Sequence, residues 1–252
     1  MPLETRAGSR TLLASELTLP PPFTLVSLRE VGDAFVHAGN IAAEQGAGTL
    51  VYVGRFDLAE FAVVLEPDEP LRTARRAFYA GMAALADSLA AHAGPDTPIE
   101  IVWPDTVRIN LGLVGGGRLG WPHGADEDAP APWLVFGAAI RTVSMGEEPG
   151  LNPLSTALEE EGFTDFASGR LVESFARHLM VMIDAWQESG FGAVAKDYLA
   201  RVAAEPGVRR DIDDNGDLLI RRVGKPEFER KKLIPALAAP SWLDRKTGGP
   251  KS

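Results

Sequence analysis

The chain of 252 residues contains no cysteine, which excludes disulfide bonds, thiolate metal ligands and thioester chemistry. It also lacks any hydrophobic run near the roughly 18 residues that a membrane-spanning helix needs. The N-terminus has no basic segment followed by a hydrophobic stretch, which is the pattern of a secretory signal peptide. We therefore expect a cytoplasmic protein that has no membrane partner.

Basic residues are outnumbered, since 25 Lys and Arg stand against 35 Asp and Glu and the net charge is −10. Affinity for nucleic acid depends on clustered Lys and Arg, so we expect no nucleic-acid partner. Hydrophobic residues make up 45% of the chain and charged residues 24%, as in ordinary globular proteins. The length is sufficient for one large domain with a small appendage.

The spacing of hydrophobic residues predicts both helices and strands. A helix is expected within residues 23–45, where Phe35 and Ala38 share one face. Ser168 is expected to cap a long amphipathic helix. This helix is expected to cover residues 169–189. Two further helices are predicted over residues 70–93 and 192–204. The predicted strands are residues 49–54, 60–65, 99–102, 106–111 and 133–140, of which the first two form a hairpin.

A second hairpin is predicted near the C-terminus, where Asp214-Asn215-Gly216 separates strands over residues 208–212 and 217–223. The run from Asp211 to Asp217 also matches the first half of an EF-hand calcium loop. The twelfth position of that loop requires a bidentate Glu and is Arg222 here, so the hairpin is the better interpretation. The basic tail that follows is expected to be part ordered and part frayed.

One stretch, Ile99 to Leu119, is the most informative part of the chain. It reads as a strand, a sharp Trp103-Pro104-Asp105 turn, a second strand, and the glycine cluster Gly115–Gly117. These glycines suit either a tight turn or a place where a ligand approaches the backbone closely, and both readings stay open. A dinucleotide-binding turn is excluded, because Trp121-Pro122 follows the glycines and cannot begin the helix that such a site needs.

The sequence WPDTVRINLGLVGG resembles the W-P-N-D-[strand]-K-x-G-G segment of the biotin and lipoate protein ligases. Trp103-Pro104 and Gly115-Gly116 match that segment. Asp105 stands where the family has Asn, and Thr106 stands where it has Asp. Leu113 occupies the place of the catalytic lysine. Members of this family activate a small carboxylic acid as its adenylate and pass the acyl group to a lysine of an acceptor protein.

The resemblance implies an α+β fold of the class II aminoacyl-tRNA synthetase/biotin synthetase type, with a mixed or antiparallel β-sheet flanked by helices and a small C-terminal β domain. Residues 1–22 are polar and end in Leu19-Pro20-Pro21-Pro22, so they are expected to form an extended lead-in. The resemblance then implies a ligase-like domain over residues 23–206 and the β domain and tail over residues 207–252. ATP, Mg²⁺, and biotin or lipoate are the implied small-molecule partners, and a biotinyl or lipoyl carrier domain is the implied protein partner.

The chain departs from the family pattern at several charged positions. The long Gly/Arg-rich loop that covers the adenylate in the family is reduced here to a short connection in which Arg55 is the one cation. The later G-x-G-x-N segment keeps Gly137 but has Arg141 in the Asn position. Removing one electrostatic contributor can lower a rate by roughly 100- to 1000-fold. The implied activity is therefore that of a diverged member.

The resemblance and the residues together nominate a substrate-binding or adenylate-binding site, without metal ligands and without an assigned catalytic residue. Arg118 and Arg141 suit a carboxylate or phosphate, and they equally suit salt bridges. Asp105 and Thr106 suit a metal-bound nucleotide or a ligand amide, and they equally suit capping of the turn. The nominated residues are Trp103, Pro104, Asp105, Thr106, Gly115, Gly116, Arg118, Gly137, Arg141 and Arg55.

Three hypotheses for the function follow. The first is an ATP-dependent acyl-adenylate ligase that attaches a small carboxylic acid to a carrier-protein lysine. The second is a non-catalytic protein on the same fold that binds a small acid or a carrier domain. The third is a structural or assembly partner with an empty pocket. Fold alone does not choose among them, because function depends on the site.

Overall fold

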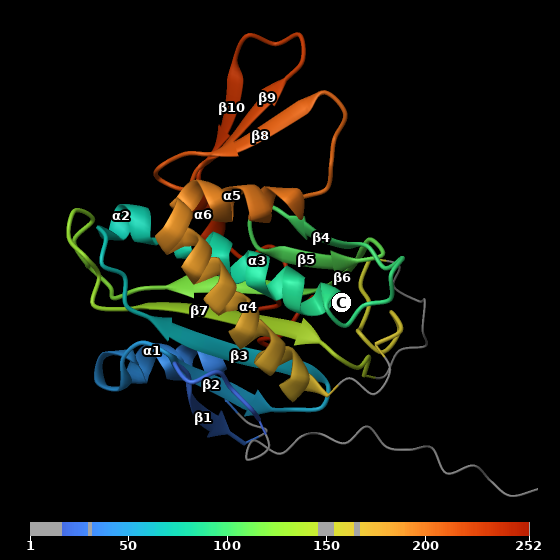
Figure 1. The fold of residues 1–252 in the computed structure, drawn as a ribbon. Helices are drawn as coiled ribbons and strands as arrows, with labels where there is room; N and C mark the ends of the chain where they lie inside the picture. Colours follow the sequence, from blue (N-terminus) through green and yellow to red (C-terminus); the bar gives the residue numbers. More distant parts are fainter. Residues whose placement is uncertain (1–16, 30–31, 146–153, 164–166, 252) are drawn as a thin grey trace, which may run out of the picture.

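A seven-stranded mixed β-sheet forms the centre of the computed structural model, which describes residues 17–29, 32–145, 154–163 and 167–251 (Figure 1). The strands run in the order β1 (Thr24–Leu28), β2 (Thr49–Gly54), β3 (Leu58–Leu65), β7 (Leu134–Arg141), β6 (Gly112–Gly120), β5 (Thr106–Ile109) and β4 (Ile99–Val102). β1 is parallel to β2, and the other pairs are antiparallel. This confirms the predicted mixed sheet.

Most of the helices cover one face of this sheet (Figure 1). They are α2 (Leu71–Ala74), α3 (Ala77–Ala90), α4 (Ser168–Ser189) and α5 (Phe191–Ala200). α3 is buried along nearly its whole length because it packs against strands of the sheet and against α4 and α5. The core on this side includes Phe61 and Phe136 of the sheet and Phe175 of α4.

A single helix, α1 (Ala34–Gln45), covers part of the other face, over β2, β3 and β7. Its alanines pack against Val51, Val53 and Val135. β2 and β3 are therefore hydrophobic at nearly every position, because alternate side chains enter two different hydrophobic clusters.

A separate three-stranded sheet stands at one end of the molecule (Figure 1). Its strands are β8 (Val208–Ile212), β9 (Leu218–Arg222) and β10 (Phe228–Lys231), in the order β10-β9-β8. The predicted β8–β9 hairpin is confirmed. After β10 and α6 (Leu233–Leu237), the chain returns to the seven-stranded sheet.

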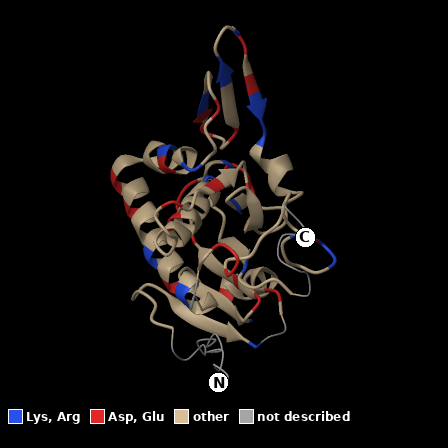
Figure 2. Ribbon diagram, turned by 90° about the vertical axis from the view of Figure 1, so that its right-hand side faces the viewer, with Lys and Arg blue, Asp and Glu red and all other residues tan. Residues whose placement is uncertain are grey.

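The C-terminal part is the basic end of an acidic chain, and Figure 2 shows Lys and Arg on the strands of the small sheet. Residues 207–252 hold 11 Lys and Arg against seven Asp and Glu. Several of these charges are paired, since Arg230 contacts Asp213 and Asp217, and Arg222 contacts Glu205.

The glycine cluster does not form a tight turn, which was one of the two interpretations of the sequence. Gly115, Gly116 and Gly117 lie inside β6, whereas the turn before β6 is made by Asn110 and Leu111, both at positive φ. The surrounding backbone leaves no room for a Cβ at Gly115 or Gly116. Only glycine fits at these two positions of the strand, although glycine is normally unfavourable in strands.

Other boundaries also differ from the sequence prediction. Residues 24–28 form β1, and α1 begins only at Ala34 after Asp33, whose side chain accepts from the N–H of Val36 at 3.0 Å. The single helix predicted over residues 70–93 is broken between α2 and α3, where the backbone N–H and the side chain of Arg76 both donate to the Thr73 carbonyl. β10 and α6 were not predicted.

Ser168 is the first residue of α4 and does not cap it. Ala167 occupies the cap position, and the Ser168 hydroxyl bonds to the Tyr52 hydroxyl at 2.6 Å and to the Arg55 carbonyl at 3.0 Å. In the described part of the chain, no helix is long and apolar enough to cross a membrane.

Candidate functional site

The Trp103-Pro104 turn joins β4 to β5 and is anchored to the helical side of the sheet. The peptide bond between the two residues is cis. The Trp103 indole N–H donates to the hydroxyl of Tyr79 on α3 at 3.1 Å, and the Pro104 carbonyl accepts from the hydroxyl of Tyr198 on α5 at 2.8 Å. Trp103 and Pro104 therefore hold the turn in place, and the next residue points to different neighbours.

That next residue, Asp105, has a fully buried side chain that contacts the C-terminal part of the chain. Its carboxylate accepts from the backbone N–H of Ser241 at 3.1 Å and from the Ser241 hydroxyl at 2.8 Å. The Thr106 hydroxyl bonds both to this carboxylate, at 3.0 Å, and to the Ser241 hydroxyl, at 2.7 Å. Burial raises the pKa of Asp105, and the hydrogen bonds from Ser241 and Thr106 act in the opposite direction.

The glycines of β6 give Trp242 a place against the backbone of the sheet. A Cβ on Gly116 would lie 2.5 Å from Cδ1 of Trp242, and a Cβ on Gly115 would lie 1.9 Å from the Ala139 carbonyl oxygen. The indole is fully buried, and its N–H donates to the Gly117 carbonyl at 3.1 Å. The glycine floor is thus already covered by an aromatic ring.

Leu113, which the sequence resemblance aligns with the family's catalytic lysine, lies beside a small hydrophobic cluster. Leu58, Ala139 and Trp242 form this cluster, and Leu113 and Leu243 pack against it. An apolar side chain in apolar surroundings thus occupies this position.

Arg141 lies at the end of β7, beside the same part of the chain. Its guanidinium donates to the carbonyl oxygens of Pro250 at 2.8 Å and Lys251 at 2.9 Å. It also reaches the Thr156 carbonyl at 3.5 Å. Arg141 is thus held by backbone carbonyl groups.

Arg55 belongs to the three-residue connection between β2 and β3, whose shortness agrees with the sequence prediction. Its guanidinium pairs with Asp57 at 2.7 Å, and this hydrogen bond lowers the pKa of Asp57. The charge of Arg55 is therefore engaged within its own loop.

Arg118 and Gly137 lie where α1 approaches the sheet. The Arg118 guanidinium, whose side chain is 14% exposed, pairs with Asp33 at 2.9 Å and lies over the Phe35 ring at 4.5 Å. A Cβ on Gly137 would lie 2.7 Å from the Phe35 ring. Both residues therefore serve the packing of α1, in keeping with the salt-bridge alternative for Arg118.

A buried carboxylate lies beside this pair. Glu60 on β3 is 4% exposed and accepts from the Ala34 backbone N–H at 2.8 Å. Burial raises the pKa of Glu60, while that hydrogen bond and Arg118 act in the opposite direction.

The structure brings four of the ten nominated residues together against residues 241–251 and leaves the others elsewhere. Those brought together are Asp105, Thr106, Gly116 and Arg141. Gly115 lies next to Gly116 but packs against the backbone of β7, and Trp103, Pro104, Arg118, Gly137 and Arg55 lie elsewhere. Sequence reasoning missed Ser241, Trp242 and Glu60. Only Glu60 carried a local signal, as the one charge inside the hydrophobic strand EFAVVL.

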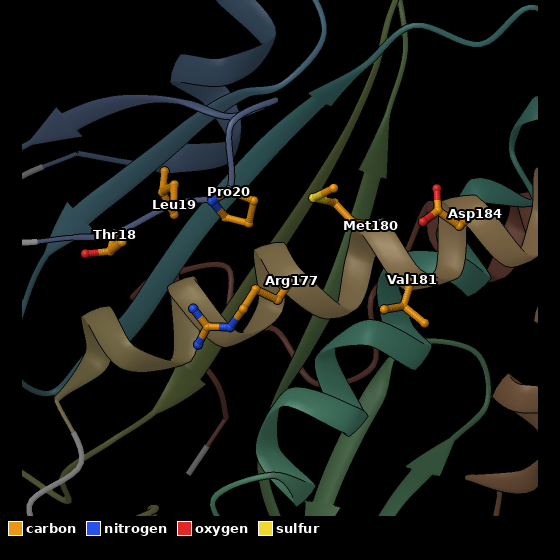
Figure 3. Close-up of a pocket in the computed structure, with 7 residues that line it drawn as sticks. All are labelled: Thr18, Leu19, Pro20, Arg177, Met180, Val181 and Asp184. Carbon is orange, nitrogen blue, oxygen red and sulfur yellow. The ribbon is translucent and has the colours of Figure 1, made fainter.

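A hollow on the helical side of the molecule contains none of the nominated residues. Figure 3 shows it between the chain at residues 18–20 and four side chains of α4. Met180 and Val181 are apolar, and Arg177 and Asp184 supply one charge of each sign. Among the described residues, no group of three or more His, Cys, Asp or Glu side chains is placed to hold a metal ion.

These features define an α+β protein with helices on both faces of a mixed sheet, in which a Trp-Pro-Asp turn lies beside the glycines of β6. Residues 19–200 match the model of the biotin/lipoate A/B protein ligase family. The chain belongs to this family.

Two relatives are 28% identical to this chain over the matched regions. A biotin–[acetyl-CoA-carboxylase] ligase of Paracoccus denitrificans matches in an alignment of 180 residues, which covers 63% of this chain and 72% of that protein. A biotin protein ligase-like protein of unknown function from Silicibacter sp. TM1040 has a crystal structure that matches with a TM-score of 0.72, over 86% of this chain and 97% of that one.

A point mutant of the biotin protein ligase from Aquifex aeolicus, in complex with biotin, matches with a TM-score of 0.62. The match covers 84% of this chain and 99% of that one. The identity is 13%, so this likeness shows the fold alone.

Proposed function

We propose that this chain binds a small carboxylic acid on the face of β6 and β7 against which Trp242 packs, and that it does not efficiently convert the acid to an adenylate. Family membership supports the acid ligand, with biotin and lipoate as the first candidates. The observation that carries the second half of the proposal is the packing of Leu113 against the Trp242 cluster, at the position where the family resemblance puts a lysine.

Adenylation places the acid carboxylate against the α-phosphate of ATP, where negative charge must be stabilised by preorganised cations. The neighbouring guanidinium groups are engaged elsewhere, since Arg55 pairs with Asp57 and Arg141 donates to backbone carbonyls. Arg118 pairs with Asp33. The charge distribution therefore favours binding over activation.

A second candidate is an ATP-dependent ligase that transfers the acyl group to a lysine of a carrier domain. The Paracoccus relative is a biotin ligase, and Asp105 keeps a buried carboxylate beside the Trp-Pro turn. In this candidate, Asp105 and Thr106 supply oxygen atoms for Mg-ATP, and Arg141 supplies the missing cation.

Acid-dependent exchange of pyrophosphate into ATP separates the two candidates. We expect background exchange from the wild-type chain with biotin, lipoate or octanoate. We expect Leu113→Lys to raise the rate by about 100-fold or more, because one electrostatic contributor is restored. Leu113→Met conserves volume without adding charge and is the matched control.

The melting temperature of each variant checks that the fold is kept. Acid-dependent exchange by the wild-type chain at least as fast as by Leu113→Lys would contradict the proposal and support the ligase.

A further inference from the structure

The last described residues, 238–251, form a closed loop that we call the C-terminal segment. The Lys251 N–H donates to the Trp242 carbonyl at 2.8 Å, and the Asp244 N–H donates to the Gly249 carbonyl at 2.9 Å. The Gly248 N–H donates back to the Asp244 carbonyl at 2.8 Å. The segment is therefore tied to itself, so it can move as one unit.

The segment makes the contacts that a ligand with a ring and oxygen acceptors would make on the same face. The Trp242 ring lies on the glycine floor at Gly116. The Ser241 hydroxyl donates to the Asp105 carboxylate, and backbone carbonyls accept from Arg141. The Trp242 ring, the Ser241 hydroxyl and the backbone carbonyls of the segment thus contact nominated residues of the site.

The attachment of the segment is narrow. Of residues 241–251, only Trp242 and Pro250 are buried, and the run from Arg245 to Gly248 is exposed. Segments with few buried apolar contacts open with a smaller free energy than the core of a protein. The segment follows α6 and contributes no strand to the seven-stranded sheet, so its opening leaves the pairing of β6 with β7 in place.

We propose that the C-terminal segment is a displaceable cover, which competes with the small carboxylic acid for the glycine floor and lifts when the acid binds. The inference rests on the proposed function for the identity of the ligand. A cover of this kind lowers the apparent affinity by the fraction of molecules that are open. Weakening the cover must then tighten binding, although no residue that contacts the acid has been changed.

Ser241→Ala is the variant that weakens the cover. It removes the hydroxyl that bonds to Asp105 and Thr106, and hydrogen bonds to a charged group of this kind correspond to roughly a tenfold change in an equilibrium. Lys246→Ala, on an exposed position of the same segment, is the matched control. Calorimetric titration of the full chain with biotin, and separately with lipoate, should give about tenfold tighter binding for Ser241→Ala and unchanged binding for Lys246→Ala.

Hydrogen exchange of the full chain without ligand tests the opening itself. Two N–H groups of the segment donate to the sheet, the Ser241 amide to Asp105 and the Trp242 indole to the Gly117 carbonyl. Both should exchange through a local opening, faster than amides of β3 and β7, and the acid should accelerate them further. Exchange of these two groups only at the rate of global unfolding would overturn the inference. Equal acid affinities of Ser241→Ala and the wild type would also overturn it, while leaving the proposed function intact.

If neither biotin nor lipoate binds to the wild type, to Ser241→Ala or to Lys246→Ala, that result contradicts the proposed function instead. In that case the hydrogen-exchange rates without ligand still test whether the C-terminal segment opens. Exchange through a local opening supports a displaceable cover, and exchange only by global unfolding overturns it.

Discussion

Replacing Trp242 by alanine gives a loss of stability whose size depends on whether the C-terminal segment can open. The indole is fully buried among Leu58 and Ala139, and its N–H bonds to the Gly117 carbonyl. If the segment were a fixed part of the core, Trp242→Ala would lower the free energy of unfolding by about 3–5 kcal/mol.

An openable segment limits that loss. The substitution destabilises only the closed form, so the measured loss cannot exceed the free energy of opening. We therefore expect a loss below about 3 kcal/mol, the lower end of the range for a fixed core residue. Adding Ser241→Ala should remove little more, because the open form already dominates and the two changes are not additive.

Urea denaturation followed by far-UV circular dichroism measures these losses. Phe136→Ala is the control, because Phe136 is fully buried on the helical side of β7 and should show the whole loss of about 3–5 kcal/mol. A loss for Trp242→Ala as large as that for Phe136→Ala, with a further additive loss from Ser241→Ala, would refute the reasoning.

Four further predictions concern a glycine of the sheet and three acidic side chains. Gly115→Ala should lower the free energy of unfolding in urea by about 1–3 kcal/mol or more, because its Cβ would overlap a backbone carbonyl at positive φ. Asp33→Ala should cost about 1–2 kcal/mol by the same measurement, and Asp33→Asn less, because Asn keeps the helix cap but loses the charge that pairs with Arg118. Burial raises the pKa of Glu60 above its ordinary value of 4.5. The contribution of Glu60 to the free energy of unfolding, measured against Glu60→Gln, should therefore be full below pH 4.5 and should fall as the pH rises through the raised pKa. The opposite slope would contradict this. The pKa of Asp57 is lowered, so its contribution, measured against Asp57→Asn, should be present above 3.8 and be lost as the pH falls further.

The central strands and long helices could be predicted from sequence because their patterns are strong. β2, β3 and β7 are hydrophobic on both faces, and α4 has a clear apolar stripe. β1 was missed because it is short and lies at the sheet edge, where its side chains are partly exposed. β6 was not predicted because glycines are disfavoured in strands, and the close approach of Ala139 and Trp242 to these glycines joins residues far apart in the sequence.

The candidate site was predictable only where its residues are close in sequence. The Trp-Pro-Asp turn and the glycine pair lie within one stretch, and the structure keeps Asp105 and Gly116 together. Ser241, which donates two hydrogen bonds to Asp105, lies 136 residues away in the chain, in a basic tail that has no local signal of burial. Pairing of Arg118 with Asp33 likewise joins residues 85 positions apart.

Thermal-shift titration distinguishes binding of the acid from its adenylation and also reports the opening of the C-terminal segment. Wild-type chain and Ser241→Ala are each titrated with biotin, lipoate and octanoate, with and without Mg-ATP. A ligand at roughly 100 times its Kd adds about 2.7 kcal/mol of stability, which is readily measured. We expect an acid alone to stabilise both chains, and Ser241→Ala more than the wild type at equal concentration, and we expect ATP to add nothing. Stabilisation that requires acid and ATP together, or none with any of the acids, would contradict it.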